Sequence, residues 1–168
     1  MIRFAPIART AALGFALLAD TAAAVEIHHS PVENLERVDV ALIATAERTI
    51  DVAAFVLSNH PVITALNDAS ARGVEVRIVL DRSQLSRSFV DRIAGPEVRV
   101  SPAGPLMHLK SYAVDGRTLR TGSANFTASG LKHQANDLIV IEEPGAVAQF
   151  RAAFEREWNR STPIEVRR

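Results

Sequence analysis

Apolar residues recur with two different periods in the first half of the chain, and these periods predict strands that alternate with helices. Apolar side chains recur at every second position from Ile50 to Val56, and residues 74–80 are rich in β-branched side chains, so both segments predict strands. Apolar side chains return at helical spacing over 35–46 and over 63–69. Further strands are predicted at 25–29 and 98–100, and a further short helix at 89–93. This order predicts an α/β fold.

The second half of the chain contains the strongest hairpin signal. Residues 109–114 and 118–121 are strand-like, and the Asp-Gly dipeptide at 115–116 between them suits a tight turn. Residues 137–142 predict one more strand, and Pro144 begins a last helix. Taken with the first half, the pattern predicts a mixed, largely parallel β-sheet flanked by helices on both faces.

The first residues of the chain differ in composition from the rest. Arg3 and Arg9 give a positively charged start, residues 11–19 form a short apolar run, and residues 22–24 are alanines. This order of charged, apolar and small residues predicts a secretory signal peptide over 1–24. The apolar run is too short to span a bilayer, so a transmembrane helix is not expected there. An uncleaved amphipathic helix is the alternative. We therefore expect an exported protein, periplasmic or secreted, with no membrane span after the signal is removed.

The rest of the chain predicts one catalytic domain with a short extension. Residues 25–160 hold all of the predicted strands and helices, which is an ordinary length for one domain, and residues 161–168 form a polar C-terminal tail. Near the start of the domain, Ser30 and Glu33 have the spacing of a capping box, with a proline at the first helical position. The first helix is therefore expected to begin directly after Ser30.

Composition and charge narrow the classes of function. The 168 residues are 48% hydrophobic and carry 19 basic and 19 acidic side chains, so no overall positive field attracts nucleic acid. A polyanion would have to be captured locally. The sequence contains no cysteine, which excludes disulfides, thiolate metal sites and a cysteine nucleophile. The histidine spacing matches no zinc pattern, so no metal or other cofactor is expected.

One segment carries side chains with catalytic chemistry. His108 and Lys110 are two residues apart on a predicted strand, so both side chains leave the same face. Ser123 and Asn125 have the same spacing on the segment beyond the hairpin turn. The hairpin therefore brings a nucleophile close to three donors that suit phosphate oxygens. Taken singly, such a histidine or lysine is usually a surface residue; the combination is far more specific.

The spacing of these side chains resembles the signature of the phospholipase D superfamily, H-x-K-x4-D-x6-G-S-x-N. The matching residues are His108, Lys110, Asp115, Gly122, Ser123 and Asn125. The resemblance extends over nearly all of 25–160, including residues 71–81 and the closing helix with Trp158. Within the superfamily, the chain resembles the small, single-motif bacterial endonucleases.

The resemblance implies a two-step displacement at phosphorus without a metal ion. One histidine attacks and forms a covalent phosphohistidine, while a second histidine, from another copy of the motif, protonates the leaving oxygen and then activates water. By resemblance, His108 is the nucleophile or the acid/base. Lys110 and Asn125 bind phosphate, and Ser123 is a supporting donor. Asp115 is expected to be structural rather than catalytic.

One position departs from the signature. The superfamily usually has an acidic residue followed by an amide downstream of the Ser-x-Asn element, where it orients the histidine, whereas this chain has Asn136 followed by Asp137. A shift by one residue on a strand turns a side chain to the opposite face. Either the loop before these residues absorbs the shift and Asp137 is the catalytic orienting group, or Asn136 orients His108 without charge.

These observations predict a non-specific endonuclease that hydrolyses DNA, with RNA as an alternative substrate, and works as a homodimer. The dimer follows from the single motif, because the implied mechanism needs two histidines at one phosphorus. Two alternatives remain. One is a phospholipid headgroup hydrolase, which would want an exposed apolar rim near the site. The other is a degenerate member that binds phosphodiesters without turnover.

Overall fold

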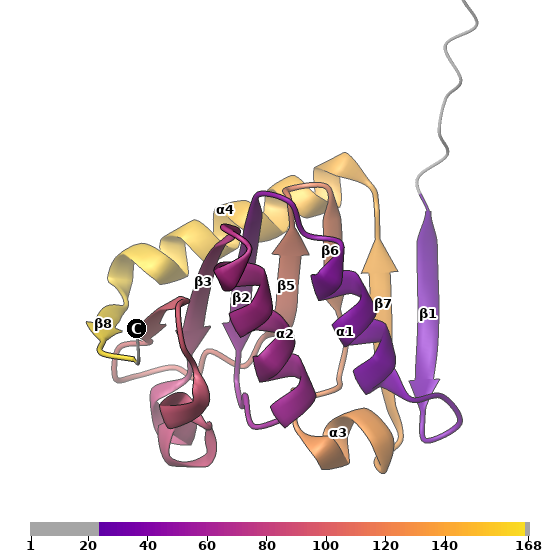
Figure 1. The fold of residues 1–168 in the computed structure, drawn as a ribbon, viewed down its shortest axis with the longest axis horizontal. Coiled ribbons are helices and arrows are strands. Elements are labelled where there is room, and N and C mark those ends of the chain that lie inside the picture. The colour runs from indigo at the N-terminus through magenta and orange to yellow at the C-terminus, as the bar shows by residue number, and fades with distance from the viewer. Residues whose placement is uncertain (1–23, 167–168) are drawn as a thin grey trace, which may run out of the picture.

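The computed structural model describes residues 24–166 and contains one eight-stranded sheet with helices on both faces (Figure 1). The strands are β1 (Val25–Ser30), β2 (Thr49–Ala54), β3 (Glu75–Leu80), β4 (Glu97–Val100), β5 (Lys110–Val114), β6 (Thr118–Thr121), β7 (Asn136–Ile141) and β8 (Thr162–Ile164). The helices are α1 (Leu35–Ala44), α2 (His60–Ala71), α3 (Ala128–Lys132) and α4 (Pro144–Arg160), with short 3-10 helices at Arg82–Arg87 and Val90–Arg92. The predicted α/β class and the helices on both faces are confirmed.

Parallel pairing is confined to three neighbouring strands, β2, β3 and β4. The strand order is β1-β7-β6-β5-β2-β3-β4-β8, and only the β2–β3 and β3–β4 pairs are parallel. The other five neighbouring pairs are antiparallel. The sheet is mixed, as predicted, but the expectation that it is largely parallel was wrong. Parallel neighbours need a crossover connection, and the tight turn between β5 and β6 instead starts an antiparallel run that continues through β7 to β1.

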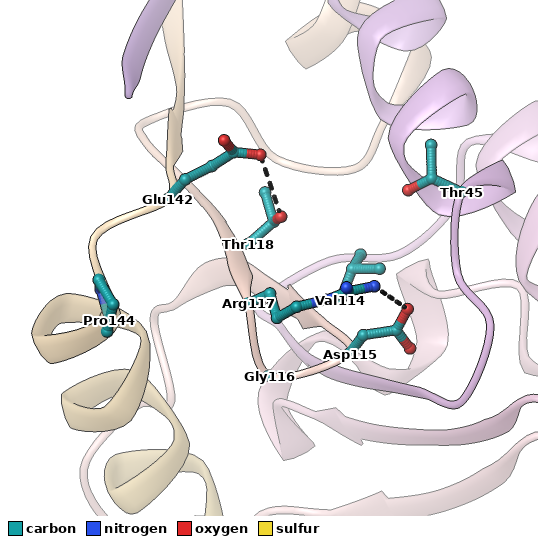
Figure 2. A pocket seen from close by; sticks show the side chains of 8 residues that line it. All are labelled: Thr45, Val114, Asp115, Gly116, Arg117, Thr118, Glu142 and Pro144. Atoms are coloured by element: carbon teal, nitrogen blue, oxygen red, sulfur yellow. Dashed lines mark hydrogen bonds and ion pairs between the residues drawn. The ribbon is translucent and has the colours of Figure 1, made fainter. Parts of the chain in front are cut away.

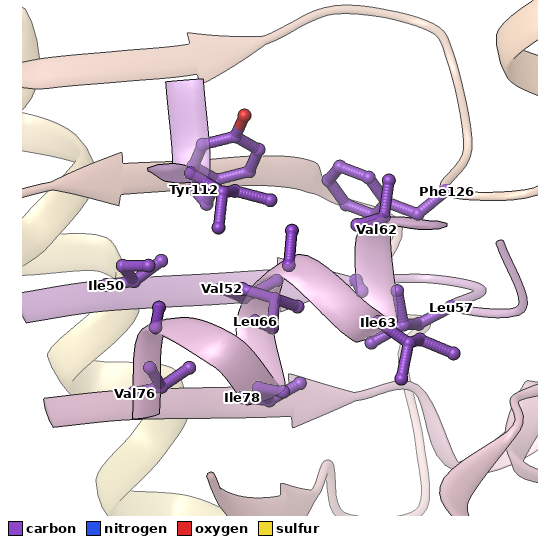
Figure 3. Packing of buried hydrophobic residues seen from close by; sticks show 14 of the residues in the cluster. Ile50, Val52, Leu57, Val62, Ile63, Leu66, Val76, Ile78, Tyr112 and Phe126 are labelled. Carbon is purple, nitrogen blue, oxygen red and sulfur yellow. The ribbon is translucent and has the colours of Figure 1, made fainter. Parts of the chain in front are cut away.

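The helices divide between the two faces of the sheet, and each face has its own core. On one face, which α1, α2 and α3 cover, Val52 and Ile78 pack with Leu66 of α2 (Figures 1 and 3). On the other face, Ala53 lies in a second cluster with Phe154 of α4. The alternation along β2 therefore sends neighbouring side chains to opposite cores. Each large apolar side chain buried in this way contributes about 1.5–3 kcal/mol.

The start of α1 differs from the prediction. The helix begins at Leu35 and is capped by Asn34, whose side chain accepts from the Arg37 N–H. Ser30 is instead the last residue of β1, where its Oγ donates to the Gln134 carbonyl at 2.6 Å. Glu33 accepts from the backbone N–H of His29. The capping box was therefore a wrong interpretation, because Ser30 is held by the pairing of β1 with β7.

Two short elements near the C-terminal half were not predicted. Residues 128–132 form α3, which Thr127 caps by accepting from the Gly130 N–H. Residues 162–164 form β8, which pairs antiparallel with β4 at the edge of the sheet. Part of the tail expected after residue 160 is thus ordered by pairing with β4.

The predicted signal peptide over 1–24 lies outside the described residues except for Ala24. Within residues 24–166, no helix combines the length and the apolar character that crossing a membrane requires.

Candidate active site

The motif residues gather at one end of the sheet. β2 and β3 end there, β5 begins there, and the antiparallel pairing of β6 with β5 returns the chain to the same end. The carboxyl ends of parallel strands are a common position for ligand sites in α/β folds. The topology therefore places His108 beside the loop that carries Ser123 and Asn125.

His108 is exposed just before β5, and two neighbours hold its ring. The Phe55 ring lies 4.2 Å from the imidazole, centroid to centroid, at an interplanar angle of 58°. Lys110 Nζ lies 3.0 Å from Nδ1 and 3.2 Å from Nε2 of His108. An ammonium has only donors, so it can bond only a ring nitrogen without a proton. The contact therefore holds the imidazole against the ammonium.

Lys110 is buried although it carries a charge. Only 7% of the residue is exposed. Its Nζ donates to the His108 carbonyl at 2.8 Å and lies 4.7 Å from the centre of the Phe55 ring. Burial lowers the pKa of Lys110, because it disfavours the charged form. The buried ammonium is thus fixed against the imidazole.

The Ser-x-Asn element lies in a loop that approaches β7 closely. Gly122 starts this loop with φ +133°, and a Cβ at Gly122 would lie 2.5 Å from the carbonyl oxygen of Asp137. Only glycine tolerates both conditions. Asn125 Oδ1 is buried and has no hydrogen-bond partner within residues 24–166. A buried polar atom without a partner suits a ligand, and the amide can turn so that its NH₂ group takes this place.

Asn136 and Asp137 contact Ser123 rather than His108. The Ser123 N–H donates to Asp137 Oδ1 at 2.8 Å, and its hydroxyl donates to Asn136 Oδ1 at 3.1 Å. Hydrogen bonding with Ser123 lowers the pKa of Asp137. Within the described chain no hydrogen bond joins either side chain to His108. The structure thus places both residues behind the Ser-x-Asn loop, and their predicted orienting role stays a prediction.

Asp115 lies at the far end of β5 from His108. Its carboxylate accepts from the backbone N–H groups of Glu47, Arg48 and Thr49 at 3.1, 2.8 and 2.9 Å. Burial raises the pKa of Asp115, but these backbone donors outweigh it and lower the pKa. A cavity of about 540 Å³ lies at that end of the sheet, and Figure 2 shows Asp115 and Arg117 among the residues that line it. The contacts agree with the structural role expected for Asp115.

Two residues that support the site were not singled out from the sequence. Phe55 follows β2 and contacts both His108 and Lys110. Asp81 follows β3 and is buried, and its Oδ2 accepts from the Met107 N–H at 2.8 Å. An aromatic or acidic residue directly after a buried strand is the signal that points to such a position, since it falls at the carboxyl end of the sheet.

The assembled groups suit nucleophilic attack on an anionic centre. An exposed imidazole lies against a buried ammonium, and a carboxamide lies in the neighbouring loop. Within residues 24–166, no three histidine or carboxylate side chains lie close enough together to hold a metal ion. Lys110 and the amide of Asn125 are donors that can offset charge on a bound oxyanion.

Comparisons with known proteins agree with this picture. Residues 40–158 match the family described as "Cardiolipin synthase, PLD-like domain". The chain is 36% identical over 120 residues to phospholipase D of Rickettsia bellii, covering 69% of this chain and 58% of that protein. It is 29% identical over 138 residues to mitochondrial cardiolipin hydrolase of Chlamydomonas reinhardtii, covering 80% of this chain and 61% of that protein. The chain thus spans about three fifths of the length of these curated relatives.

Solved structures show the same fold. Nuc from Salmonella typhimurium, a phospholipase D family member, superposes with a TM-score of 0.80 at 27% identity, covering 85% of this chain and 99% of that chain. NucT from Helicobacter pylori superposes with a TM-score of 0.77 at 14% identity, covering 84% of this chain and 99% of that chain.

Proposed function

Because the chain belongs to the phospholipase D superfamily, we propose that it is a metal-independent phosphodiesterase that cleaves nucleic acid. The main proposed substrate is DNA, and RNA is the alternative. The observation that carries this proposal is the contact of Lys110 Nζ, 3.0 Å from Nδ1 of the exposed His108 ring. A nucleophile in contact with a cation suits attack on an anionic phosphodiester, because the cation offsets charge that grows on the phosphoryl oxygens.

In the first proposed step, a ring nitrogen of His108 attacks phosphorus. A P–N bond forms while the P–O bond to the leaving sugar oxygen breaks, and that oxygen takes a proton from a second histidine. Lys110 and the amide of Asn125 donate to the non-bridging oxygens. The products are one free alcohol end and a phosphohistidine that holds the other strand end.

In the second step, the second histidine, now neutral, takes a proton from water. The water oxygen attacks phosphorus, the P–N bond breaks, and a phosphate monoester leaves while His108 is regenerated. We propose that this second histidine is His108 of a second copy, because the chain contains one H-x-K element. A two-fold axis through the site would then give one active centre per dimer.

Two exposed leucines lie near His108 in the sequence. Leu106 is 58% exposed and Leu109 is 41% exposed, on either side of the imidazole in the sequence. Exposed leucines beside an exposed catalytic ring are what the interface of a shared site would cover.

The same leucines support a second candidate function, hydrolysis of a phospholipid headgroup. Exposed apolar side chains beside a phosphodiester site would contact acyl chains, and the curated relatives above are named for lipid hydrolysis. We favour nucleic acid because the chain matches nearly the whole of the small protein Nuc and resembles the single-motif endonucleases.

Substrate choice is tested by incubating purified protein in excess chelator with plasmid, single-stranded DNA, RNA and vesicles of anionic phospholipid. The matched control is His108→Ala. Nucleic acid fragments formed only by the parent chain are the expected result. Headgroup release without nucleic acid cleavage would replace the proposal with the lipid function, and binding without any turnover would indicate a degenerate member.

The shared site is tested by refolding parent chains with an equal amount of His108→Ala chains. If both histidines are needed at one centre, only parent–parent dimers work, about a quarter of all dimers under random pairing. Activity that follows the fraction of parent chains, or an active monomer in sedimentation, would exclude the shared site.

We also propose that the protein is exported and that its mature chain begins at or near Val25. The support is the charged, apolar and small-residue order of residues 1–24. Intact-mass analysis of exported protein tests this, and retention of Met1 would contradict it.

A further inference from the structure

A buried ion pair lies beneath the proposed site. Arg120 of β6 and Asp39 of α1 are both 0% exposed. Arg120 donates from Nε to Asp39 Oδ1 at 2.8 Å and from Nη2 to Oδ2 at 3.1 Å, and the Tyr112 hydroxyl donates to the same carboxylate at 3.0 Å. Replacing a buried ion pair by apolar residues is often neutral for stability, so the pair needs another explanation.

The remaining contacts of Arg120 join the two halves of the motif. Its Nη1 donates to the Lys110 carbonyl at 2.6 Å and to the Ala124 carbonyl at 3.3 Å. Ala124 is the middle residue of the Ser-x-Asn element, directly before Asn125. One nitrogen therefore bridges the backbone of the H-x-K strand and the backbone of the Ser-x-Asn loop.

This bridge lies where the sheet stops connecting the two segments. The β5–β6 ladder reaches the pair of Tyr112 with Arg120, and β6 ends at Thr121. Gly122 then turns the loop away with positive φ. Beyond that point the guanidinium of Arg120, rather than strand pairing, ties the loop to β5.

We propose that Arg120, held in place by Asp39, is a positioning residue that sets the separation between the Lys110 ammonium and the Asn125 amide. This inference rests on the proposed function, in which both groups donate to one phosphoryl group. Arg120 is fully buried, so it cannot bind substrate itself. The planar guanidinium of Arg120 bonds the carboxylate through Nε and Nη2 and the two carbonyls through Nη1. The single ammonium of a lysine cannot make all of these bonds.

Loss of this bridge would act on the transition state more than on substrate binding. Donors that are slightly misplaced still attract a phosphodiester, but they match the developing charge less well. A shift of about 1 Å can cost on the order of 100-fold in rate. We therefore expect Arg120→Lys to lower kcat by about 10- to 100-fold and to change KM by less than about threefold.

The test compares Arg120→Lys with Arg77→Lys on bis(p-nitrophenyl) phosphate, well below the unfolding temperature of each variant. Arg77 is a matched control, because it bonds Asp51 at 2.7 Å and Glu155 at 2.6 Å on the α4 face of the sheet. Both variants should lose stability, and only Arg120→Lys should lose kcat. Equal loss of kcat in both, or an unchanged kcat in folded Arg120→Lys, would overturn the proposal.

A double-mutant cycle asks whether Arg120 acts through the loop. In an Asn125→Ala background, Arg120→Lys should cost much less than in the parent, because the group that it positions is gone. Additive effects would refute positioning through Asn125.

Orthovanadate affinity, measured by titration calorimetry, gives a readout that does not need turnover. Vanadate takes up the five-coordinate geometry of phosphoryl transfer, so Arg120→Lys should weaken it about as much as it lowers kcat. If the parent chain cleaves no phosphodiester, the proposed function fails. Vanadate affinity alone then tests whether Arg120 positions Lys110 and Asn125. Equal vanadate affinity in parent and Arg120→Lys would overturn this positioning role.

Discussion

Replacing Asp115 by asparagine separates the structural part of the motif from its chemistry. The substitution keeps the shape of the side chain but removes its charge and turns one acceptor oxygen into an NH₂ donor. In the structure, Asp115 Oδ1 accepts from Arg48 and Thr49, and Oδ2 accepts from Glu47. An asparagine can keep the first two bonds in weaker form, whereas its NH₂ would face the Glu47 N–H, donor against donor.

The expected loss follows from these three bonds. Hydrogen bonds to a charged group contribute about 1.5–3 kcal/mol each against about 0.5–1.5 kcal/mol for neutral ones. At the lower end of each range, two weakened bonds cost about 1 kcal/mol each and the lost bond costs about 1.5 kcal/mol, which amounts to about 3.5 kcal/mol. For a domain of this length, such a loss lowers the unfolding temperature by roughly 10 °C. Activity should hardly change, because Asp115 and His108 lie at opposite ends of β5, roughly 20 Å apart by the rise of a strand.

The effect should depend on pH in one direction. The pKa of Asp115 is lower in the folded chain than in the unfolded chain. Its stabilisation is therefore fully present above the unfolded pKa of about 3.9 and is lost as the pH falls through the folded value. The stability difference between parent and variant should be flat near neutrality and should shrink below about pH 4.

Urea unfolding and turnover, both measured on the same preparations, check this prediction. Arg117→Ala is the control, because Arg117 is an exposed partner of Asp115 at 3.5 Å and should contribute less than about 1 kcal/mol. A variant Asp115→Asn that keeps the stability of the parent but loses turnover would refute the structural role and place Asp115 in the chemistry.

Three further predictions concern the site itself. His108→Ala should abolish turnover with an unchanged circular dichroism spectrum, since the imidazole is exposed; activity above a few per cent would exclude it as nucleophile. Activity should survive EDTA, because Lys110 and Asn125 can offset phosphate charge, and a cleavage that only a divalent ion restores would contradict this mechanism. Asp137→Asn should slow turnover more than Asn136→Ala if Asp137 orients the imidazole, and the reverse ranking in steady-state rates would assign that role to Asn136.

The motif region could be predicted from the sequence because its signals are local. The two-residue spacing of His108 and Lys110, and the turn at 115–116, depend on strand period and turn chemistry alone. The structure confirms the hairpin and brings Lys110 into contact with His108.

Contacts between distant segments could not be predicted in the same way. Ser30 resembled a helix cap, but its pairing with Asn136, far along the chain, decided its conformation. Arg120 resembles an exposed strand residue until Asp39 is brought against it. Strand β8 is too short to give a periodic signal, and it forms because β4 offers an open edge.

The first and last strands of the described chain, β1 and β8, are the two edges of the sheet. The motif is carried by β5 and β6, near its middle. A tag or fusion partner joined directly before β1 or directly after β8 would therefore extend from an edge of the sheet, with at least two strands between that edge and β5. Surface immobilisation at these two points should accordingly keep the surface away from the motif, which would suit single-molecule or flow-cell assays of cleavage.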